Sequence, residues 1–255
     1  MKFAIFPQQV SIAGNSIYSN FAGLVSELDE VVPNSFDADA AIIWSVLWSG
    51  RMEANKKVYY EYRKQRKPVI ILETGNLIRN RTYKLCVNNI NAQGTHALDL
   101  DLDRGAILKT FSPITTKSDR ILVCCQNEKS LLWEGMASSQ VWVRNAIQGL
   151  HKDQVTIRLH PRFRSIVDLP GYNIIRPQFT DDDDTDFRDI AQHYGTIINH
   201  NSGSGIEAKM MGLTVKADNS SLANYMPEAI AKTEWFESEL PKVWQHLRPK
   251  LEKSL

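Results

Sequence analysis

Two polar segments, each following a run of apolar residues, hold the residue types best suited to chemistry in this 255-residue chain. His160-Pro161-Arg162 follows residues 155–159, and Ser202-Gly203-Ser204-Gly205 follows residues 195–199. An imidazole and a guanidinium bind phosphate oxygens, and glycines before a helix let a phosphate approach free backbone N–H groups. The two segments therefore predict a site for a nucleotide diphosphate.

The glycine-rich segment predicts a strand at 195–199, a tight turn at 202–205, a helix at 206–211 and a strand at 213–216. A phosphate at this turn would meet the positive end of the helix dipole. Glu207, in the first turn, could accept hydrogen bonds from ribose hydroxyls. The alternative is an ordinary connection, in which a serine caps the helix and an acid favours its dipole.

A third polar segment follows the predicted strand at residues 121–125. Gln126, Lys129 and Ser130 offer an amide, an ammonium and a hydroxyl to a diphosphate or a sugar. The carboxyl ends of parallel strands meet at one sheet edge, which places this segment beside the other two. A plain polar loop is the alternative.

Positive charge is concentrated between residues 51 and 90, where ten Lys or Arg face three acidic residues, a local charge of +7 in a chain of net charge +1. With aromatic residues between its members, such a stripe could follow the phosphate backbone of DNA. The alternative is a solvated helix face whose aromatic residues point into the core. The candidate DNA-binding residues are Arg51, Lys56, Lys57, Arg63, Lys64, Arg79 and Arg81.

Two acidic segments fit a metal site poorly. The four consecutive carboxylates of residues 181–184 cannot all face one ion, and the segment at residues 99–110 lacks the glutamate that a calcium loop requires, having Thr110 there. Protein cations and a helix dipole could instead balance the charge of a leaving group. We therefore expect no metal site and no cofactor.

The elements that must position these residues alternate along the chain. Strands are predicted at 2–6, 40–44 and 69–73 with helices at 16–28 and 54–65 between them, an order that predicts a parallel sheet. The pattern restarts with strands at 121–125, 155–159 and 173–175 and helices at 140–149 and 184–193. Residues 233–255 are predicted to be helical, interrupted at Pro241 and Pro249.

These segments carry a family resemblance. Residues 158–162 (RLHPR) and 201–215 (NSGSGIEAKMMGLTV) resemble the donor-binding half of GT-B glycosyltransferases, particularly bacterial capsule polysaccharide transferases. Residues 40–91, 121–133 and 232–240 are similar to a group of tailed-phage proteins regarded as glycosyltransferases.

The resemblance implies an α/β fold of the GT-B type, with two Rossmann-like halves and a cleft between them. Residues 1–117 would form the acceptor-binding domain and residues 118–232 the domain that binds a nucleotide sugar. Residues 233–255 would be a C-terminal helical segment that packs back on the first half.

The activity implied is transfer of a hexose or pentose from a UDP-sugar to a hydroxyl. Glu73 directly follows the apolar residues 68–72. We predict that it is the base that removes the proton of the acceptor hydroxyl. The alternatives are an ion pair with Arg79 or Arg81, or, if the sugar configuration is retained, a role in orienting the acceptor.

As acceptor we predict the hydroxymethyl group of 5-hydroxymethylcytosine or 5-hydroxymethyluracil in double-stranded phage DNA, because the basic stripe and the phage resemblance agree. A capsule-type transferase is the second reading, and a non-catalytic module that binds a nucleotide sugar or DNA is the third. No apolar run approaches the ~20 residues of a membrane span, and the three cysteines show no disulfide pattern. We expect a cytoplasmic protein without a membrane partner, located in the infected host cell if phage-encoded.

Overall fold

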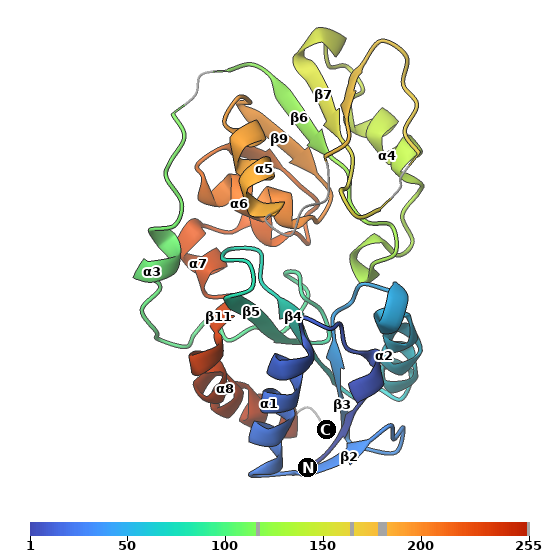
Figure 1. The fold of residues 1–255 in the computed structure, drawn as a ribbon, viewed down its shortest axis with the longest axis vertical. Helices are drawn as coiled ribbons and strands as arrows, with labels where there is room; N and C mark the ends of the chain where they lie inside the picture. The colour runs from blue at the N-terminus through green and yellow to red at the C-terminus, as the bar shows by residue number, and fades with distance from the viewer. Residues whose placement is uncertain (116–117, 164–165, 178–182, 254–255) are drawn as a thin grey trace. The chain divides into compact units, whose positions relative to one another are not determined.

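The computed structural model describes residues 1–115, 118–163, 166–177 and 183–253, and the side chains of 183–186 are outside the description. The chain folds into two compact units (Figure 1). Unit 1 consists of residues 1–104 and 231–255, and unit 2 of residues 105–230.

Unit 1 is a six-stranded sheet with the order β11-β5-β4-β3-β1-β2. The strands are β1 (Lys2–Ile5), β2 (Glu30–Pro33), β3 (Ala40–Trp44), β4 (Val69–Thr74), β5 (Thr82–Val87) and β11 (Trp235–Phe236). β1 to β4 are parallel, whereas β5 runs antiparallel to β4 and β11 antiparallel to β5. The helices are α1 (Asn15–Ser26), α2 (Asn55–Lys64) and α8 (Leu240–Glu252).

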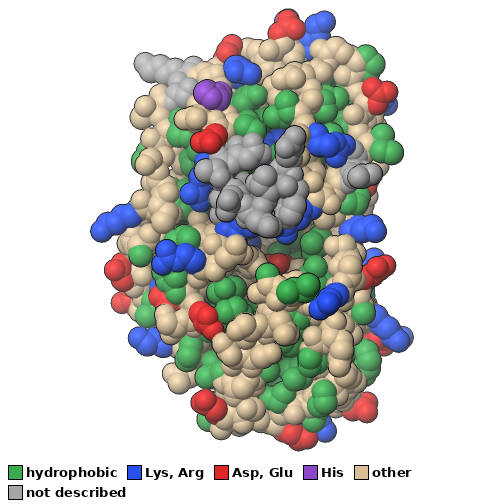
Figure 2. All heavy atoms as spheres, viewed as in Figure 1, with side chains coloured by type: hydrophobic (Ala, Val, Ile, Leu, Met, Phe, Trp, Pro, Cys, Tyr) green, Lys and Arg blue, Asp and Glu red, His purple; other side chains and the backbone are tan. Residues whose placement is uncertain are grey.

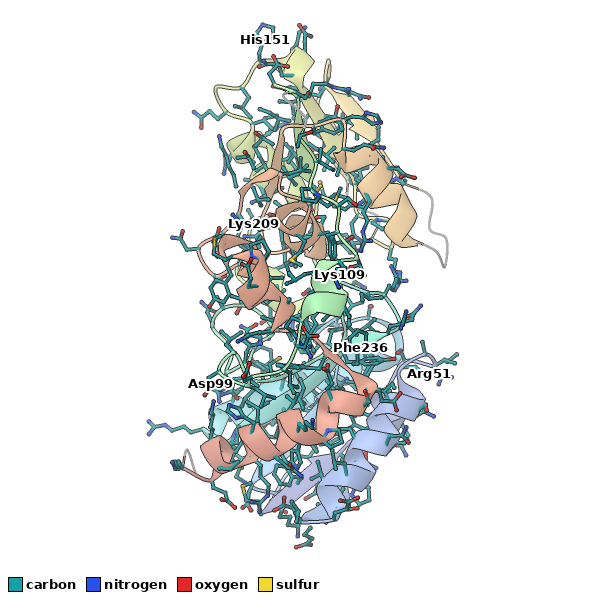
Figure 3. The ribbon with its side chains drawn as sticks, turned by 90° about the vertical axis from the view of Figure 1, so that its left-hand side faces the viewer. Arg51, Asp99, Lys109, His151, Lys209 and Phe236 are labelled. Atoms are coloured by element: carbon teal, nitrogen blue, oxygen red, sulfur yellow. The ribbon has the colours of Figure 1, made fainter. Side chains whose placement is uncertain are left out.

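The two faces of this sheet are covered by different helices. α1 and α8 pack side by side on one face, where Trp244 of α8 makes edge contacts with Phe3 and Phe21 at ring-centroid distances of 5.4 and 5.5 Å (Figure 3). α2 packs on β3 and β4 through its buried residues Val58, Tyr59 and Tyr62. The predicted return of the C-terminal helix to the first half is therefore confirmed.

Unit 2 is a parallel sheet with the order β10-β9-β6-β7-β8. Its strands are β6 (Ile121–Cys124), β7 (Val155–Arg158), β8 (Asn173–Ile175), β9 (Thr196–Asn199) and β10 (Thr214–Lys216). Its helices are α3 (Gly105–Leu108), α4 (Ser139–Ala146), α5 (Asp183–Ala191), α6 (Gly203–Met210) and α7 (Pro227–Ala231), the last of which ends at the return to unit 1. Short 3-10 helices lie at Pro7–Gln9, Gly50–Ala54, Leu131–Trp133, Lys152–Gln154, Leu222–Asn224 and Glu237–Glu239.

The predicted α/β class of the GT-B type is confirmed, and the bounds of the predicted strands and helices before residue 200 agree with the observed ones to within three residues. The strands β2, β5 and β11 and the helices α3 and α7 were missed. The helical prediction for residues 233–255 was wrong in two places: residues 235–236 form β11, and α8 continues through Pro249. Leu247 and Leu251, on either side of that proline, are buried in the core of unit 1, and this packing offsets the missing backbone hydrogen bond.

The observed boundary between the units lies at residue 104, whereas the sequence placed it at residue 117. Residues 105–115 belong with unit 2 because they pack against it. The ring of Phe111 lies 4.4 Å from the guanidinium carbon of Arg188, and the N–H of Ile114 donates to the carbonyl of Met211 at 2.8 Å. In the part of the chain that the structure describes, no helix is both long and apolar enough to span a membrane.

Candidate functional site

The carboxyl edge of the unit 2 sheet brings the predicted donor-binding segments together. Cys124, at the end of β6, is in register with Arg158 at the end of β7 and with Asn199 at the end of β9. The residues that follow these three strands include Gln126, His160 and Ser202, so each segment leaves the sheet at the same edge.

The helix of the glycine-rich segment begins earlier than the sequence predicted. α6 starts at Gly203 rather than at Ile206, so residues 203–205 form its first turn instead of a separate tight turn. The cause is Ser202, whose hydroxyl caps the helix by accepting a hydrogen bond from the N–H of Ser204 at 3.4 Å. Ser202, Gly203 and Ser204 are half-buried, so the positive end of α6 remains partly open to solvent.

Gly205 is required by packing. A Cβ at this position would collide with the side-chain amide of Asn199, which is itself buried and donates to the carbonyl of Ser202 at 3.1 Å. The glycine thus allows α6 to begin directly against the end of β9.

His160 is a neutral hydrogen-bond donor. Its Nδ1 accepts the N–H of Arg162 at 3.1 Å, which places the ring proton on Nε2 in the neutral form. Burial, the largest cause, and the positive charges of Arg158 and Arg162 together lower the pKa of His160 to about 4. At neutral pH the imidazole therefore offers one N–H, while the positive charge comes from the arginines. Arg162 is exposed.

Arg158 is a functional candidate that sequence reasoning missed. It is buried at the end of β7, and its guanidinium carbon lies 5.5 Å from the centre of the Phe187 ring. The positive charge of Arg158 favours the neutral form of His160. The pKa of Cys124 is raised to about 11, because burial outweighs the opposing charge of Arg158. The signal was an arginine in the last position of an otherwise uncharged strand, next to the His-Pro-Arg segment.

The segment after β6 has mainly internal contacts. Gln126 is buried, and its Oε1 accepts the N–H of Asn201 at 2.9 Å, which joins the connections after β6 and β9. The hydroxyl of Ser130 accepts the N–H of Leu132 and caps a 3-10 helix, as the polar-loop alternative expected. Lys129 is exposed.

Glu207 is buried and holds an ion pair within unit 2. Its Oε2 lies 3.2 Å from Nε of Arg188, whose guanidinium stacks on Phe111. The predicted contact with ribose would therefore have to be made by a carboxylate that also binds an arginine.

Glu73 lies at the carboxyl end of β4 in unit 1. Its Oε2 accepts the N–H of Val46 at 3.2 Å, and the hydroxyl of Ser45 also hydrogen-bonds to the carboxylate. Burial raises the pKa of Glu73, whereas Ser45, the backbone of Val46 and the charge of Lys84 oppose this rise. Lys84 is thus a cation whose charge acts on Glu73.

Ser45 has a left-handed backbone conformation with φ of 67°. This conformation is uncommon for residues other than glycine and is found preferentially at functional sites. Here it turns the chain after β3 so that the hydroxyl of Ser45 and the N–H of Val46 both reach Glu73.

The candidate DNA-binding residues come from three segments of unit 1. Lys56, Lys57, Arg63 and Lys64 are exposed on α2, Arg51 is exposed just before it, where it points outward in Figure 3, and Arg79 and Arg81 lie between β4 and β5. The α2 positions are spaced by seven residues, which places them on one helix face. We define these four residues as the α2 basic face.

The aromatic residues of the stripe mostly support the core alternative. Trp44, Trp48, Tyr59, Tyr62 and Tyr83 are buried, whereas Tyr60 is exposed. Lys84, which contributed to the local charge of the sequence, is buried as well and cannot belong to a surface.

The described residues contain no group of three His, Cys, Asp or Glu side chains arranged to hold a metal ion. In the segment at residues 99–110, Asp99 pairs with Lys250 at 2.9 Å and with His246 at 2.8 Å. Asp181 and Asp182 lie outside the described residues.

No protein-family model matches the chain, and no curated protein matches it. Among solved structures, Thermosulfurimonas dismutans KpsC, β Kdo 2,4 transferase, is similar over 91% of this chain and 90% of that chain, with a TM-score of 0.56 and 15% identity. The β Kdo 2,7 transferase of the same KpsC is 13% identical over 98% of this chain and 100% of that chain, with a TM-score of 0.47. Methanocaldococcus jannaschii UDP-GlcNAc 2-epimerase is 9% identical over 85% and 83%, with a TM-score of 0.32. The first of these likenesses shows that the chain has a GT-B fold.

Proposed function

We propose that this chain is a glycosyltransferase that uses a nucleotide sugar, with a UDP-sugar as donor. The observation that carries the proposal is the cluster at the carboxyl edge of the unit 2 sheet. There the neutral N–H donor of His160 is flanked by Arg158 and Arg162, and the capped start of α6 follows the strand β9. Such a set of donors and positive charges suits a leaving nucleotide diphosphate.

The transfer itself requires a base. In this proposal Glu73 accepts the proton of the acceptor hydroxyl while that oxygen bonds to the anomeric carbon of the sugar. The bond between that carbon and the diphosphate breaks, and the arginines and α6 stabilise the negative charge of the departing nucleotide. Its raised pKa makes Glu73 a better proton acceptor than an exposed carboxylate.

As acceptor we propose the hydroxymethyl group of 5-hydroxymethylcytosine or 5-hydroxymethyluracil in double-stranded DNA. The exposed lysines and arginine of the α2 basic face support this choice. A saccharide acceptor of the capsule type is the second candidate, and it is favoured by the fold shared with a Kdo transferase.

The test is incubation of the protein with a panel of nucleotide sugars and three acceptors: hydroxymethylated DNA, plain DNA and a capsule oligosaccharide. DNA is digested to nucleosides, and mass spectrometry detects an added hexose or pentose. We expect sugar on hydroxymethylated DNA alone. Sugar on the oligosaccharide alone would select the second candidate, and no transfer would leave a non-catalytic binding module.

The Glu73→Gln variant separates chemistry from binding in the same assay. Because glutamine keeps the shape and removes the base, nucleotide binding should be unchanged while turnover falls by roughly 10²–10⁴-fold. Wild-type turnover in this variant would remove Glu73 from the reaction.

We also propose that transfer needs no metal ion, since arginines and a helix dipole are available to stabilise the leaving group. Activity should survive EDTA. Complete loss that manganese or magnesium restores would contradict this.

A further inference from the structure

Lys84 is a buried charged residue in unit 1 to which the proposed reaction has assigned no role. Its side chain is only 5% exposed, and it lies on β5 directly opposite Glu73 on β4. Side chains at directly opposite positions of an antiparallel pair interact. A buried ammonium needs a partner of opposite charge, and two carboxylates are available to it, those of Glu73 and Glu234.

Glu234 reaches this region from the far end of the sequence. Its side chain is fully buried, and its Oε1 lies 3.9 Å from Nζ of Lys84 and accepts the N–H of Asn76 at 2.7 Å. Its Oε2 accepts the N–H of Leu77 at 2.9 Å and the hydroxyl of Thr82 at 2.8 Å. Three hydrogen bonds and the nearby ammonium of Lys84 thus hold this carboxylate in place.

These contacts fix both ends of the connection that begins just after Glu73. Asn76 and Leu77 are held at its start and Thr82 at its end, where β5 begins. Gly75 lies so close to Glu234 and Thr82 that a Cβ there would collide with both. Lys84 is therefore held in a rigid setting beside Glu73.

Other titratable groups of the described residues lie on β5 and α2, the elements that pack against β4. Cys86 lies next along the same face of β5, and Lys84 also acts electrostatically on Cys86 and on His96. On α2 the buried titratable residues are Tyr59 and Tyr62, whose hydroxyls donate to the carbonyls of Asn88 and Ser35 at 2.8 and 2.9 Å. Lys84 is the group here whose positive charge favours an ionised Glu73.

We propose that Lys84 is a positioning residue that keeps Glu73 ionised, and that Glu234 holds Lys84 in place for this role. The inference rests on the proposed function in one respect, namely that Glu73 accepts the acceptor proton. Burial favours the neutral carboxylic acid, which cannot accept a proton. The charge of Lys84, on the directly opposite residue of β5, opposes this effect together with the hydrogen bonds from Ser45 and the backbone of Val46.

The direct test is the titration of Glu73 by carbon NMR, with its carboxyl signal identified by its absence in Glu73→Gln. In Lys84→Met the titration midpoint should move to higher pH, so that the ionised fraction at acidic pH falls about tenfold or more. Lys84→Arg keeps the charge and should keep a midpoint closer to that of the wild type. Glu234→Gln removes the carboxylate that holds Lys84, so the midpoint should also move upward, but by less than in Lys84→Met.

Lys84→Met leaves Glu234 buried without its ammonium and could fail to fold. The double variant Lys84→Met/Glu234→Gln removes both charges, a change that is often neutral for stability. It should show the same upward movement of the Glu73 midpoint, because the charge opposite Glu73 is gone in both variants.

Turnover supplies a second measurement. In Lys84→Met, the acidic limb of the pH profile of kcat/KM should move to higher pH. Raising the pH should therefore restore much of the lost rate. A merely structural role would lower the rate equally at every pH. A Glu73 midpoint that stays at its wild-type value in a folded variant overturns the inference, whatever the activity. If the midpoint moves as expected but no donor is turned over, the inference stands and the proposed function fails.

Discussion

At the scale of single residues, the proposed donor site combines a neutral histidine, which donates a hydrogen bond, with arginines that supply positive charge. His160 donates an N–H without charge because burial and two neighbouring arginines disfavour its protonation. Arg162 is exposed and carries the charge that a phosphate would meet. The two residues should therefore respond differently to mutation and to pH.

Arg162→Ala should weaken nucleotide binding by about 1.5–3 kcal/mol, the usual contribution of a hydrogen bond to a charged group. Isothermal titration calorimetry with UDP measures the change. Lys152→Ala is a matched control, since Lys152 is also an exposed cation but directly precedes the opposite, amino end of β7. Equal affinity in Arg162→Ala and Lys152→Ala would remove Arg162 from the donor site.

His160 should make stability depend on pH in a definite direction. Its pKa is about 4 in the folded protein, against an ordinary value of about 6.5 when unfolded. The unfolded chain therefore binds a proton first, so this contribution to stability is full above about pH 6.5 and is lost as the pH falls toward 4.

Urea unfolding of the wild type and of His160→Gln, from pH 7.5 down to 4.5, measures this loss. The free energy of unfolding of the wild type should fall more steeply with decreasing pH than that of the variant. Parallel curves would show that His160 is not held in the neutral form.

At the scale of elements, the start of α6 is fixed by its fit against β9. Ser202 caps the helix, and the absence of a side chain at Gly205 lets Asn199 occupy the space beside it. Asn199 in turn bonds to the carbonyl of Ser202, which closes a short connection between the strand end and the helix. The position of the N–H groups at the start of α6 therefore depends on the absence of a Cβ at Gly205.

Gly205→Ala should destabilise the protein by about 1–3 kcal/mol, because the added Cβ displaces a buried amide in a packed site. Nucleotide affinity should fall as well, since the start of α6 has to move. Gly23→Ala is the matched control: Gly23 lies inside α1 with no atom near the added Cβ, so the same change should stabilise the protein by about 0.5–1 kcal/mol. Chemical denaturation of both variants gives the comparison, and equal effects of the two would contradict this account of Gly205.

At the scale of the whole molecule, net charge gives little attraction for DNA, because the formal charge is only +1. Lys and Arg side chains are interspersed with Asp and Glu over the face in Figure 2. Binding to a polyanion would therefore depend on local concentrations of charge such as the α2 basic face.

If the α2 basic face contacts DNA phosphates, affinity should fall steeply as salt rises, because bound counterions are released. Lys64→Ala should reduce the slope of log K against log salt by about one unit. Fluorescence anisotropy with a labelled duplex measures both slopes, and Lys152→Ala serves again as the exposed control. Identical slopes for the wild type and Lys64→Ala would place the DNA contact elsewhere.

The sequence by itself determined the parts of the molecule that follow a local rule. Apolar runs such as residues 40–44 and 69–73 predicted strands, and the turn residues between them predicted where the chain leaves the sheet. The two donor-site segments could be placed at one edge because all carboxyl ends of a parallel sheet lie together. Strand order and register came from the structure, in which β5 and β11 run antiparallel to their neighbours.

Only the tertiary structure decided which charged residues are buried and which groups act on them. β5 carries Lys84 within an otherwise mostly apolar segment, so its pattern did not indicate a strand. The lysine is buried because Glu234, 150 residues later in the chain, lies 3.9 Å from it. The hydrophobic periodicity of a sequence indicates which face of a helix or strand a residue occupies. It does not indicate the oppositely charged partner that offsets the cost of burying a charge, because that partner comes from a distant part of the chain. For the same physical reason the environment of Glu73 became visible only when β4, β5 and the returning C-terminal segment were assembled.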